Sequence, residues 1–168
     1  MNILLVFLLT VSCKQSDNNI SNKPSIVDTS KYSIIQFSNS GDWFFKDAKP
    51  SNLTTAEIQN AEAVLLKCIE NYNSEQQKQF DKISKEHPEY NLKLQDFIID
   101  LKKYKRQYVP VLTKKGQKEV WINFFCETSN KNWRKEIIHV DDGGNCYFNV
   151  IINLTTKTYH ELMVNGVA

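Results

Sequence analysis

The apolar positions of this chain recur with a helical period in its first half and with a strand period in its second half. A helix is predicted to begin at Thr54, because Thr54 and Glu57 have the spacing of a capping box, in which two side chains satisfy backbone N–H groups at a helix start. The apolar residues that follow share one helical face, namely Ile58, Ala61, Leu65, Cys68, Ile69 and Tyr72. Because Cys68 lies on this face, its thiol is expected to be buried and unreactive.

Two further helices are expected after the first. Residues 73–87 are strongly polar and would form an exposed helix anchored by Phe80 and Ile83, which Pro88 ends. Apolar residues at helical spacing over residues 92–101 predict the third helix.

From Tyr104 onward the period changes to two, which is typical of strands. Strands are predicted over residues 104–112, 119–126, 135–140, 145–153 and 157–164, after a shorter one over 32–37. Pro110 lacks a backbone N–H, so its part of the strand is expected to lie at an edge or a bulge. The Asp-Asp-Gly-Gly sequence at 141–144 predicts a hairpin turn, because glycine adopts positive φ readily.

Helices followed by strands predict an α+β domain, with N-terminal helices packed on one face of a C-terminal antiparallel meander of about four or five strands. This order is similar to cystatin-type α+β folds. Residues 107–111 resemble the Gln-x-Val-x-Gly inhibitory loop of cystatins, but Val111 replaces the glycine, and the segment is expected to be an ordinary strand. The likeness is architectural and implies no function.

The second face of the predicted sheet, away from the helices, carries aromatic and amide groups and is the candidate binding surface. Its candidate binding residues are Trp121, Asn123, Phe125, Tyr147, Asn149, Tyr159 and Glu161, with Met163 on the same face and Arg106, Trp133 and Arg134 at the rim. Tyrosine and tryptophan are favoured at interfaces. The alternative is that this face is covered by the N-terminal tether, by the segment around Trp43, or by a second copy of the chain.

Three adjacent aromatic residues, Trp43, Phe44 and Phe45, precede the first helix. We expect a loop that Trp43 and Phe45 pin onto the domain, because three neighbouring rings cannot all face one core. An exposed aromatic contact for a partner is the alternative.

The best cluster of titratable groups is His139, Asp141 and Asp142. An imidazole beside carboxylates suits a hard metal ion or acid–base chemistry. A tight turn also favours aspartate, so the turn alone explains these residues. The sequence contains no zincin, P-loop, dinucleotide-binding or nucleophile-elbow motif, so no catalytic residue and no cofactor is predicted.

Charge and cysteine usage narrow the remaining classes. The formal net charge is only +2, which does not favour a nucleic-acid partner. Cys126 and Cys146 occupy apolar-face positions on neighbouring predicted strands, so they are expected to lie close enough to form a disulfide. An oxidising compartment outside the cytoplasm would favour that bond.

The N-terminus predicts where the protein is located. Residues 3–9 are an apolar run that is too short to span a bilayer and has the size of the core of a secretory signal. The sequence Thr10-Val11-Ser12-Cys13 then resembles the lipobox of bacterial lipoprotein precursors. The resemblance implies cleavage before Cys13 and acylation of Cys13. Thr10 stands where the family usually has Leu, Val or Ile, and no basic residue precedes Cys13, so a plain secretory signal or an apolar N-terminal helix remains the alternative.

The predicted organisation is a signal peptide over 1–12, the lipid-attachment cysteine and a flexible tether over 13–30, and a single α+β domain over 31–168. The expected function is that of a membrane-anchored lipoprotein of the bacterial cell envelope, at the outer membrane or cell surface, with a non-enzymatic binding role. Its partner would be a protein, a peptide or a small ligand, and an inhibitor or immunity protein is one form. The alternative is a metal-binding or hydrolytic envelope protein that uses His139, Asp141 and Asp142.

Overall fold

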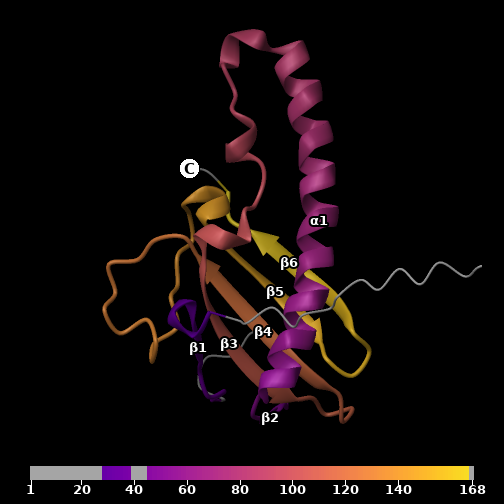
Figure 1. Cartoon of the computed structure of the whole chain (residues 1–168), viewed down its shortest axis with the longest axis vertical. Coiled ribbons are helices and arrows are strands. Elements are labelled where there is room, and N and C mark those ends of the chain that lie inside the picture. Colours follow the sequence, from indigo (N-terminus) through magenta and orange to yellow (C-terminus); the bar gives the residue numbers. More distant parts are fainter. Residues whose placement is uncertain (1–27, 39–44, 167–168) are drawn as a thin grey trace, which may run out of the picture.

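One long helix packs against a six-stranded, mostly antiparallel sheet in this computed structural model, which describes residues 28–38 and 45–166 (Figure 1). The elements are β1 (Tyr32–Ile34), β2 (Lys49–Pro50), α1 (Thr55–Glu86), β3 (Lys105–Leu112), β4 (Lys118–Phe125), β5 (Tyr147–Asn153) and β6 (Thr158–Val164). Strands β3 to β6 form an antiparallel meander, β1 joins β3 in parallel, and β2 pairs with the far end of β3. The predicted α+β class is confirmed, with one helix where several were expected.

Helix α1 begins with the predicted capping box. The Thr54 hydroxyl accepts from the Glu57 N–H at 3.2 Å, and the Glu57 carboxylate accepts from the Thr54 N–H at 2.8 Å. The predicted stripe is buried from Ile58 to Ile69, Cys68 included. Burial raises the pKa of the Cys68 thiol to about 11, which makes it a poor nucleophile, as expected.

Residues 73–86 continue α1 instead of forming a second helix, because nothing breaks the helix before Pro88. The predicted third helix is wrong: residues 87–104 return toward the sheet through three 3-10 turns, η2 (Pro88–Tyr90), η3 (Leu94–Asp96) and η4 (Leu101–Lys103). The Asn73 amide donates to the Ile99 carbonyl and accepts from the Ile99 N–H, both at 2.8 Å. These two backbone groups are therefore not available for the hydrogen bonds of a helix. Figure 1 shows the C-terminal half of α1 and the segment that follows it projecting beyond the sheet.

Two further differences concern loops. Residues 135–140 form part of a long loop instead of a strand, because the side chains of β3 and β4 take up its backbone groups, as described below. Gly143 and Gly144 have the expected positive φ, 101° and 59°, but they lead into the 3-10 turn η5 (Gly144–Cys146) and not into a hairpin. The predicted edge or bulge position of Pro110 is wrong, because β3 is an interior strand with β4 on one side and β1 and β2 on the other, and Pro110 pairs with Val120 in regular register. Pro110 lies between the residues of β3 that pair with β1 and those that pair with β2, and its carbonyl accepts from the Ser51 N–H at 3.2 Å.

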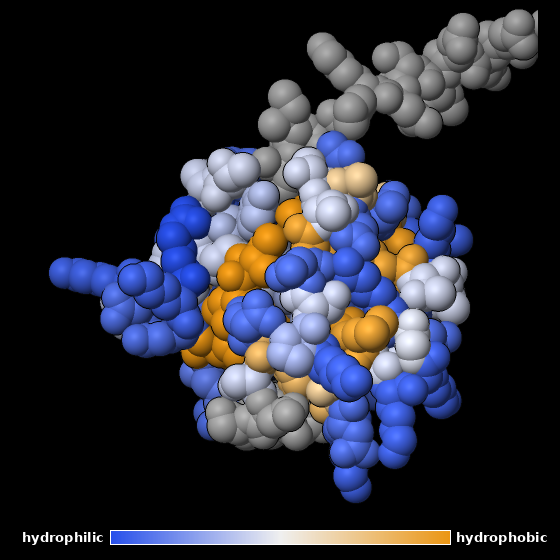
Figure 2. All heavy atoms as spheres, turned by 90° about the horizontal axis from the view of Figure 1, so that it is seen from below, coloured by the Kyte–Doolittle hydropathy of each residue, from blue (hydrophilic) through white to orange (hydrophobic). Residues whose placement is uncertain are grey.

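The main core lies between α1 and the sheet. Phe124 and Phe148 stack with ring centroids 4.2 Å apart, and Tyr104 meets Phe148 edge to face at 5.1 Å. Leu65, Cys68 and Ile69 of α1 pack against the same cluster. Seen from the end that carries β2, apolar side chains reach the surface in separate groups among hydrophilic ones (Figure 2).

An ion pair is enclosed in this core. The Glu62 carboxylate of α1 accepts from the Arg106 guanidinium and from the Tyr108 hydroxyl, both on β3. The Arg106 and Glu62 side chains are only 11% and 16% exposed, and the guanidinium lies 5.4 Å from the centre of the Phe124 ring. The Glu62 carboxylate raises the pKa of Arg106, so the guanidinium stays charged. The prediction that Arg106 lies at the rim of the second sheet face is therefore wrong. Arg106 instead stabilises the contact between β3 and α1.

The buried tyrosines predict a loss of stability at alkaline pH. Burial raises the pKa of Tyr104 to about 12 and that of Tyr108 further, whereas the same phenols ionise near pH 10 in the unfolded chain. The un-ionised Tyr104 phenol thus contributes its full stabilisation of the folded state below about pH 10, and this stabilisation is lost as the pH rises toward 12. Tyr104→Phe is expected to reduce the stability loss between pH 9 and 11 by about 1 kcal/mol in urea unfolding. The exposed Tyr90→Phe variant is the control, and equal losses in wild type and Tyr104→Phe would contradict the prediction.

Candidate functional site

The face of the sheet opposite α1, here called the outer face, brings together most of the predicted binding residues. Asn123 pairs with Asn149 across β4 and β5, and Phe125 pairs with Tyr147. Trp121 lies one pair further along β4, opposite Ile151. The alternation read from the sequence is therefore correct for these two strands.

The alternation fails on β6. A register shift lies between the pairs formed by Asn149 and Ile151, and Glu161 adopts a positive φ of 52°. Tyr159 consequently turns toward α1, where its hydroxyl accepts from the Asn71 amide at 3.0 Å. The prediction that Tyr159 shares the outer face is wrong, because one extra residue reverses the faces.

His160 occupies the outer face in place of Tyr159, opposite Ile151. Its imidazole lies 3.5 Å from the Glu119 carboxylate and 3.8 Å from that of Glu161. Glu161 is exposed at the bulge. Met163 keeps the predicted face and pairs with Asn149.

Much of the outer face is covered, as the alternative interpretation held. Phe37 and Phe45 meet edge to face at 6.0 Å and pack with Trp121, which is 5% exposed. The expectation that Phe45 pins its loop is confirmed, whereas Trp43 and Phe44 lie outside the described residues. Phe125 is fully buried beneath Trp133 and Ile138.

The second cover is the disulfide loop, residues 127–145, which the Cys126–Cys146 bond closes. The predicted disulfide is confirmed, with the two Cα atoms 5.0 Å apart. Trp133 lies within this loop, and the Lys105 ammonium and Arg134 guanidinium are 5.2 and 4.3 Å from the centre of its ring. Arg134 also donates to the backbone carbonyl of Tyr32 at 2.8 Å. Of the predicted rim residues, Arg134 thus attaches the disulfide loop to β1, and Trp133 attaches it to β3 and β4 through Lys105 and Phe125.

A buried amide pair holds this loop against the sheet. Gln107 of β3 donates to the carbonyls of Trp133 and Glu136, and its oxygen accepts from the Ile138 N–H at 3.0 Å. Asn123 donates to Gln107 at 3.1 Å and to the Ile138 carbonyl at 2.7 Å. Asn123 therefore positions the loop. Sequence analysis did not identify Gln107, although its place on the same strand face as Val109 and Val111 is a usable signal.

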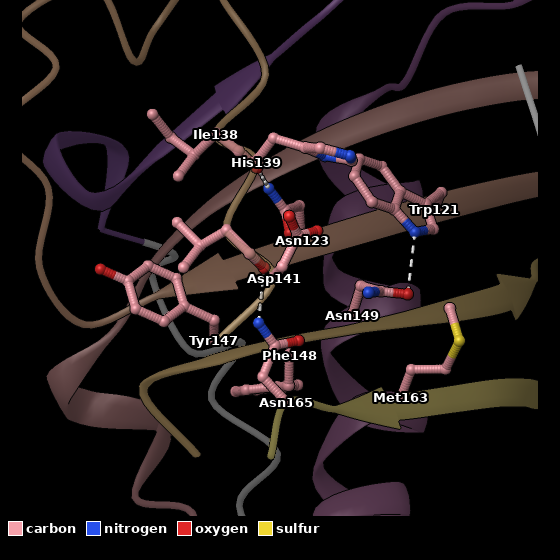
Figure 3. A pocket seen from close by; sticks show the side chains of 11 residues that line it. Trp121, Asn123, Ile138, His139, Asp141, Tyr147, Phe148, Asn149, Met163 and Asn165 are labelled. Atoms are coloured by element: carbon pink, nitrogen blue, oxygen red, sulfur yellow. Dashed lines mark hydrogen bonds between the residues drawn. The ribbon is translucent and has the colours of Figure 1, made fainter. Parts of the chain in front are cut away.

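A hollow of about 430 Å³ remains between the outer face and the disulfide loop, and we call it the outer hollow (Figure 3). The lining residues that bear on binding are Trp121, His139, Asp141, Asn149, Met163 and Asn165. Figure 3 shows the Trp121 indole nitrogen directed at Asn149, whose oxygen accepts from it at 3.1 Å. Met163, which also lines the hollow, is 42% exposed.

The outer hollow contains hydrogen-bonding groups that the described part of the chain does not use. Asn149 engages only its oxygen, so its side-chain N–H groups have no partner among the described residues. Asn165 engages only its nitrogen, which donates to the carbonyls of Val140 and Asp142 at 2.6 and 3.1 Å. The Asp141 carboxylate forms no ion pair within residues 28–38 and 45–166. The hollow thus presents a donor, an acceptor and a negative charge.

The titratable cluster is only partly assembled. His139 and Asp141 both line the outer hollow, but Asp142 does not. In the described part of the chain, no group of three or more histidine, cysteine or acidic side chains is close enough to hold a metal ion. A metal site built from His139, Asp141 and Asp142 therefore lacks a complete set of ligands among the described residues.

The fold and the hollow define a class of small α+β domain with one long helix on one sheet face and a disulfide-closed loop over the other. No protein-family model, curated protein or solved structure matches this chain. Among the described residues, no helix is both long and apolar enough to cross a bilayer. Cys13 and the lipobox-like motif lie outside the described residues.

Proposed function

We propose that the protein is a bacterial lipoprotein, held in the cell envelope through Cys13, whose domain binds a peptide or a small polar ligand in the outer hollow. The role is one of binding and not of catalysis, and an inhibitor or immunity protein is one form of it. The lipobox-like sequence supports the anchor. The Cys126–Cys146 disulfide supports a location outside the reducing cytoplasm.

One observation carries the binding role, namely the unused polar groups of Asn149, Asn165 and Asp141 around one concave site. Small-ligand sites are concave and combine apolar walls with a few convergent polar groups. Trp121 and Met163 contribute apolar surface here. Because Asp141 is the negatively charged lining residue, the hollow favours a neutral or positively charged ligand.

Two variants test the hollow in the full-length protein. Asn149→Leu removes the free donor without adding a charge, and Asp141→Asn removes the negative charge. We expect each to reduce recovery of the bound partner by about tenfold in affinity capture from envelope extracts, since hydrogen bonds to charged groups contribute about 1.5–3 kcal/mol. The matched control is Asp142→Asn, because that neighbouring carboxylate does not line the hollow.

Equal recovery of the same partners from wild type and from both hollow variants would show that the outer hollow is not the binding site. The anchor is tested in the same strains by labelling with radioactive palmitate. Wild type is expected to incorporate label and Cys13→Ala to incorporate none. Equal label in both would refute the anchor.

A further inference from the structure

A second hollow, of about 510 Å³, lies on the other side of the sheet, between α1 and the start of β6. We call it the basic hollow. Asn60, Ala63, Val64 and Lys67 of α1 line one side, and residues 157–159 line the other. Figure 1 shows α1 passing in front of β5 and β6 in this region, and the hydrogen bond between Asn71 and Tyr159 at 3.0 Å connects α1 and β6.

The α1 residues form a continuous wall because they are spaced at i, i+3, i+4 and i+7 and share one helical face. Ala63 and Val64 are apolar, and the half-buried Tyr159 of β6 lines the same hollow. The wall is therefore mainly apolar, with a lysine at each side, Lys67 on α1 and Lys157 in the turn before β6.

The charge of this hollow is one-sided. No acidic side chain lines it, and neither Lys67 nor Lys157 forms an ion pair with any described residue. Among the carboxylates of α1, Glu57 contacts Lys118 at 2.6 Å and Glu62 contacts Arg106. Glu70, three residues beyond Lys67, forms no ion pair with a described residue and does not line the hollow. Two ammonium groups thus flank an apolar wall without a negative partner in the described part of the chain.

We infer that the basic hollow binds a single anionic amphiphile, whose phosphate or carboxylate head contacts Lys67 and Lys157 and whose apolar chain packs on Ala63, Val64 and the Tyr159 ring. Lysine is a common phosphate ligand, and its ammonium group offers three donors. The Asn60 amide and the Thr158 hydroxyl line the same hollow and add polar groups to it. This site is separate from the outer hollow and does not depend on the function proposed for it.

The test uses the full chain with Cys13→Ala, so that no attached acyl chain competes, and dodecyl phosphate below its critical micelle concentration. We expect saturable binding in an NMR titration, with the largest amide shifts at residues 63–67 and 157–159. Lys67→Gln and Lys157→Asn are each expected to weaken binding by about tenfold. Asparagine is chosen at position 157 because Lys157 has a positive φ of 57°, which asparagine tolerates. Lys82→Gln, an exposed lysine further along α1, is the control and should bind as wild type does.

Three further probes separate the sources of the ligand chemistry. Inorganic phosphate should bind much more weakly than dodecyl phosphate, and equal binding would remove the role of the apolar wall. Dodecyltrimethylammonium should not bind at these residues, and equal binding would remove the role of the lysines. Binding to vesicles of phosphatidylglycerol and phosphatidylcholine without binding of monomeric dodecyl phosphate would overturn the inference in favour of a membrane-surface contact.

Discussion

Replacing Glu62 with alanine is expected to lower the free energy of unfolding by about 3–5 kcal/mol, because it leaves the buried Arg106 guanidinium without a counter-charge. The Tyr108 hydroxyl, which is fully buried, loses its acceptor in the same step. The measurement is urea unfolding at pH 7, followed by circular dichroism. The expected loss of unfolding free energy is a large fraction of the stability of an ordinary domain.

The control for this prediction is Glu70→Ala, which removes an exposed carboxylate from the same helix and should change stability by no more than about 0.5 kcal/mol. Replacing both Glu62 and Arg106 with leucine should restore part of the loss, since an apolar pair requires no buried charge compensation but the Tyr108 hydroxyl still lacks its acceptor. A loss below about 1 kcal/mol for Glu62→Ala would contradict the enclosed ion pair and would indicate that water reaches Arg106.

Removing the disulfide with Cys126→Ser and Cys146→Ser together is expected to lower the free energy of unfolding by about 3 kcal/mol, the value for a closed loop of this size. The two cysteines are 20 residues apart, and the bond restricts the unfolded chain over that length. Hydrogen exchange should also accelerate in residues 127–145, because only noncovalent contacts, such as those of Gln107, Asn123 and Asn165, would then hold the loop on the outer face. Urea unfolding with and without a reducing agent provides the measurement.

The reducing agent supplies an internal control. It should lower wild-type stability to the level of the double serine variant and should leave that variant unchanged. The single free thiol of the described residues, Cys68, remains buried and should react with iodoacetamide only on unfolding. Wild-type stability that does not respond to complete reduction would refute the stabilising role of the bond.

The elements that sequence analysis predicted correctly are those defined by local rules. The Thr54–Glu57 capping box marks the start of α1 because both partners lie within one turn. The alternation in β4 and β5 assigns Phe124 and Phe148 to the helix side and Asn123 and Asn149 to the outer face. The same parity placed Cys126 and Cys146 close enough to bond.

The incorrect predictions involve contacts between residues far apart in the chain. Residues 92–101 have helical spacing, yet Asn73 binds the backbone of Ile99 and an irregular path results. Residues 135–140 have the composition of a strand, yet Gln107 and Asn123 provide hydrogen-bond partners for their backbone. The bulge at Glu161 moves Tyr159 to the α1 side, and no local pattern in β6 announces it.

The candidate site shows the same division. Trp121 and Asn149 were identified from parity, and both line the outer hollow. Asn165 and Asp141 contribute the remaining polar groups because the disulfide loop and the end of β6 converge there. Lys67 and Lys157 of the basic hollow are separated by most of the domain in sequence, and only the packing of α1 beside β6 brings them to one site.

By itself, the sequence determined the α+β class, the buried stripe of α1 and the pairing of the two disulfide cysteines, because each depends on residue spacing within a segment or on the parity of neighbouring strands. Only the tertiary structure decided which polar groups stay unused, since a side chain such as Asn123 is equally able to bind a ligand or to hold a loop until its neighbours are known. Hydrogen bonds and ion pairs join residues from all parts of the fold, and each of the two hollows contains polar groups that no described residue engages.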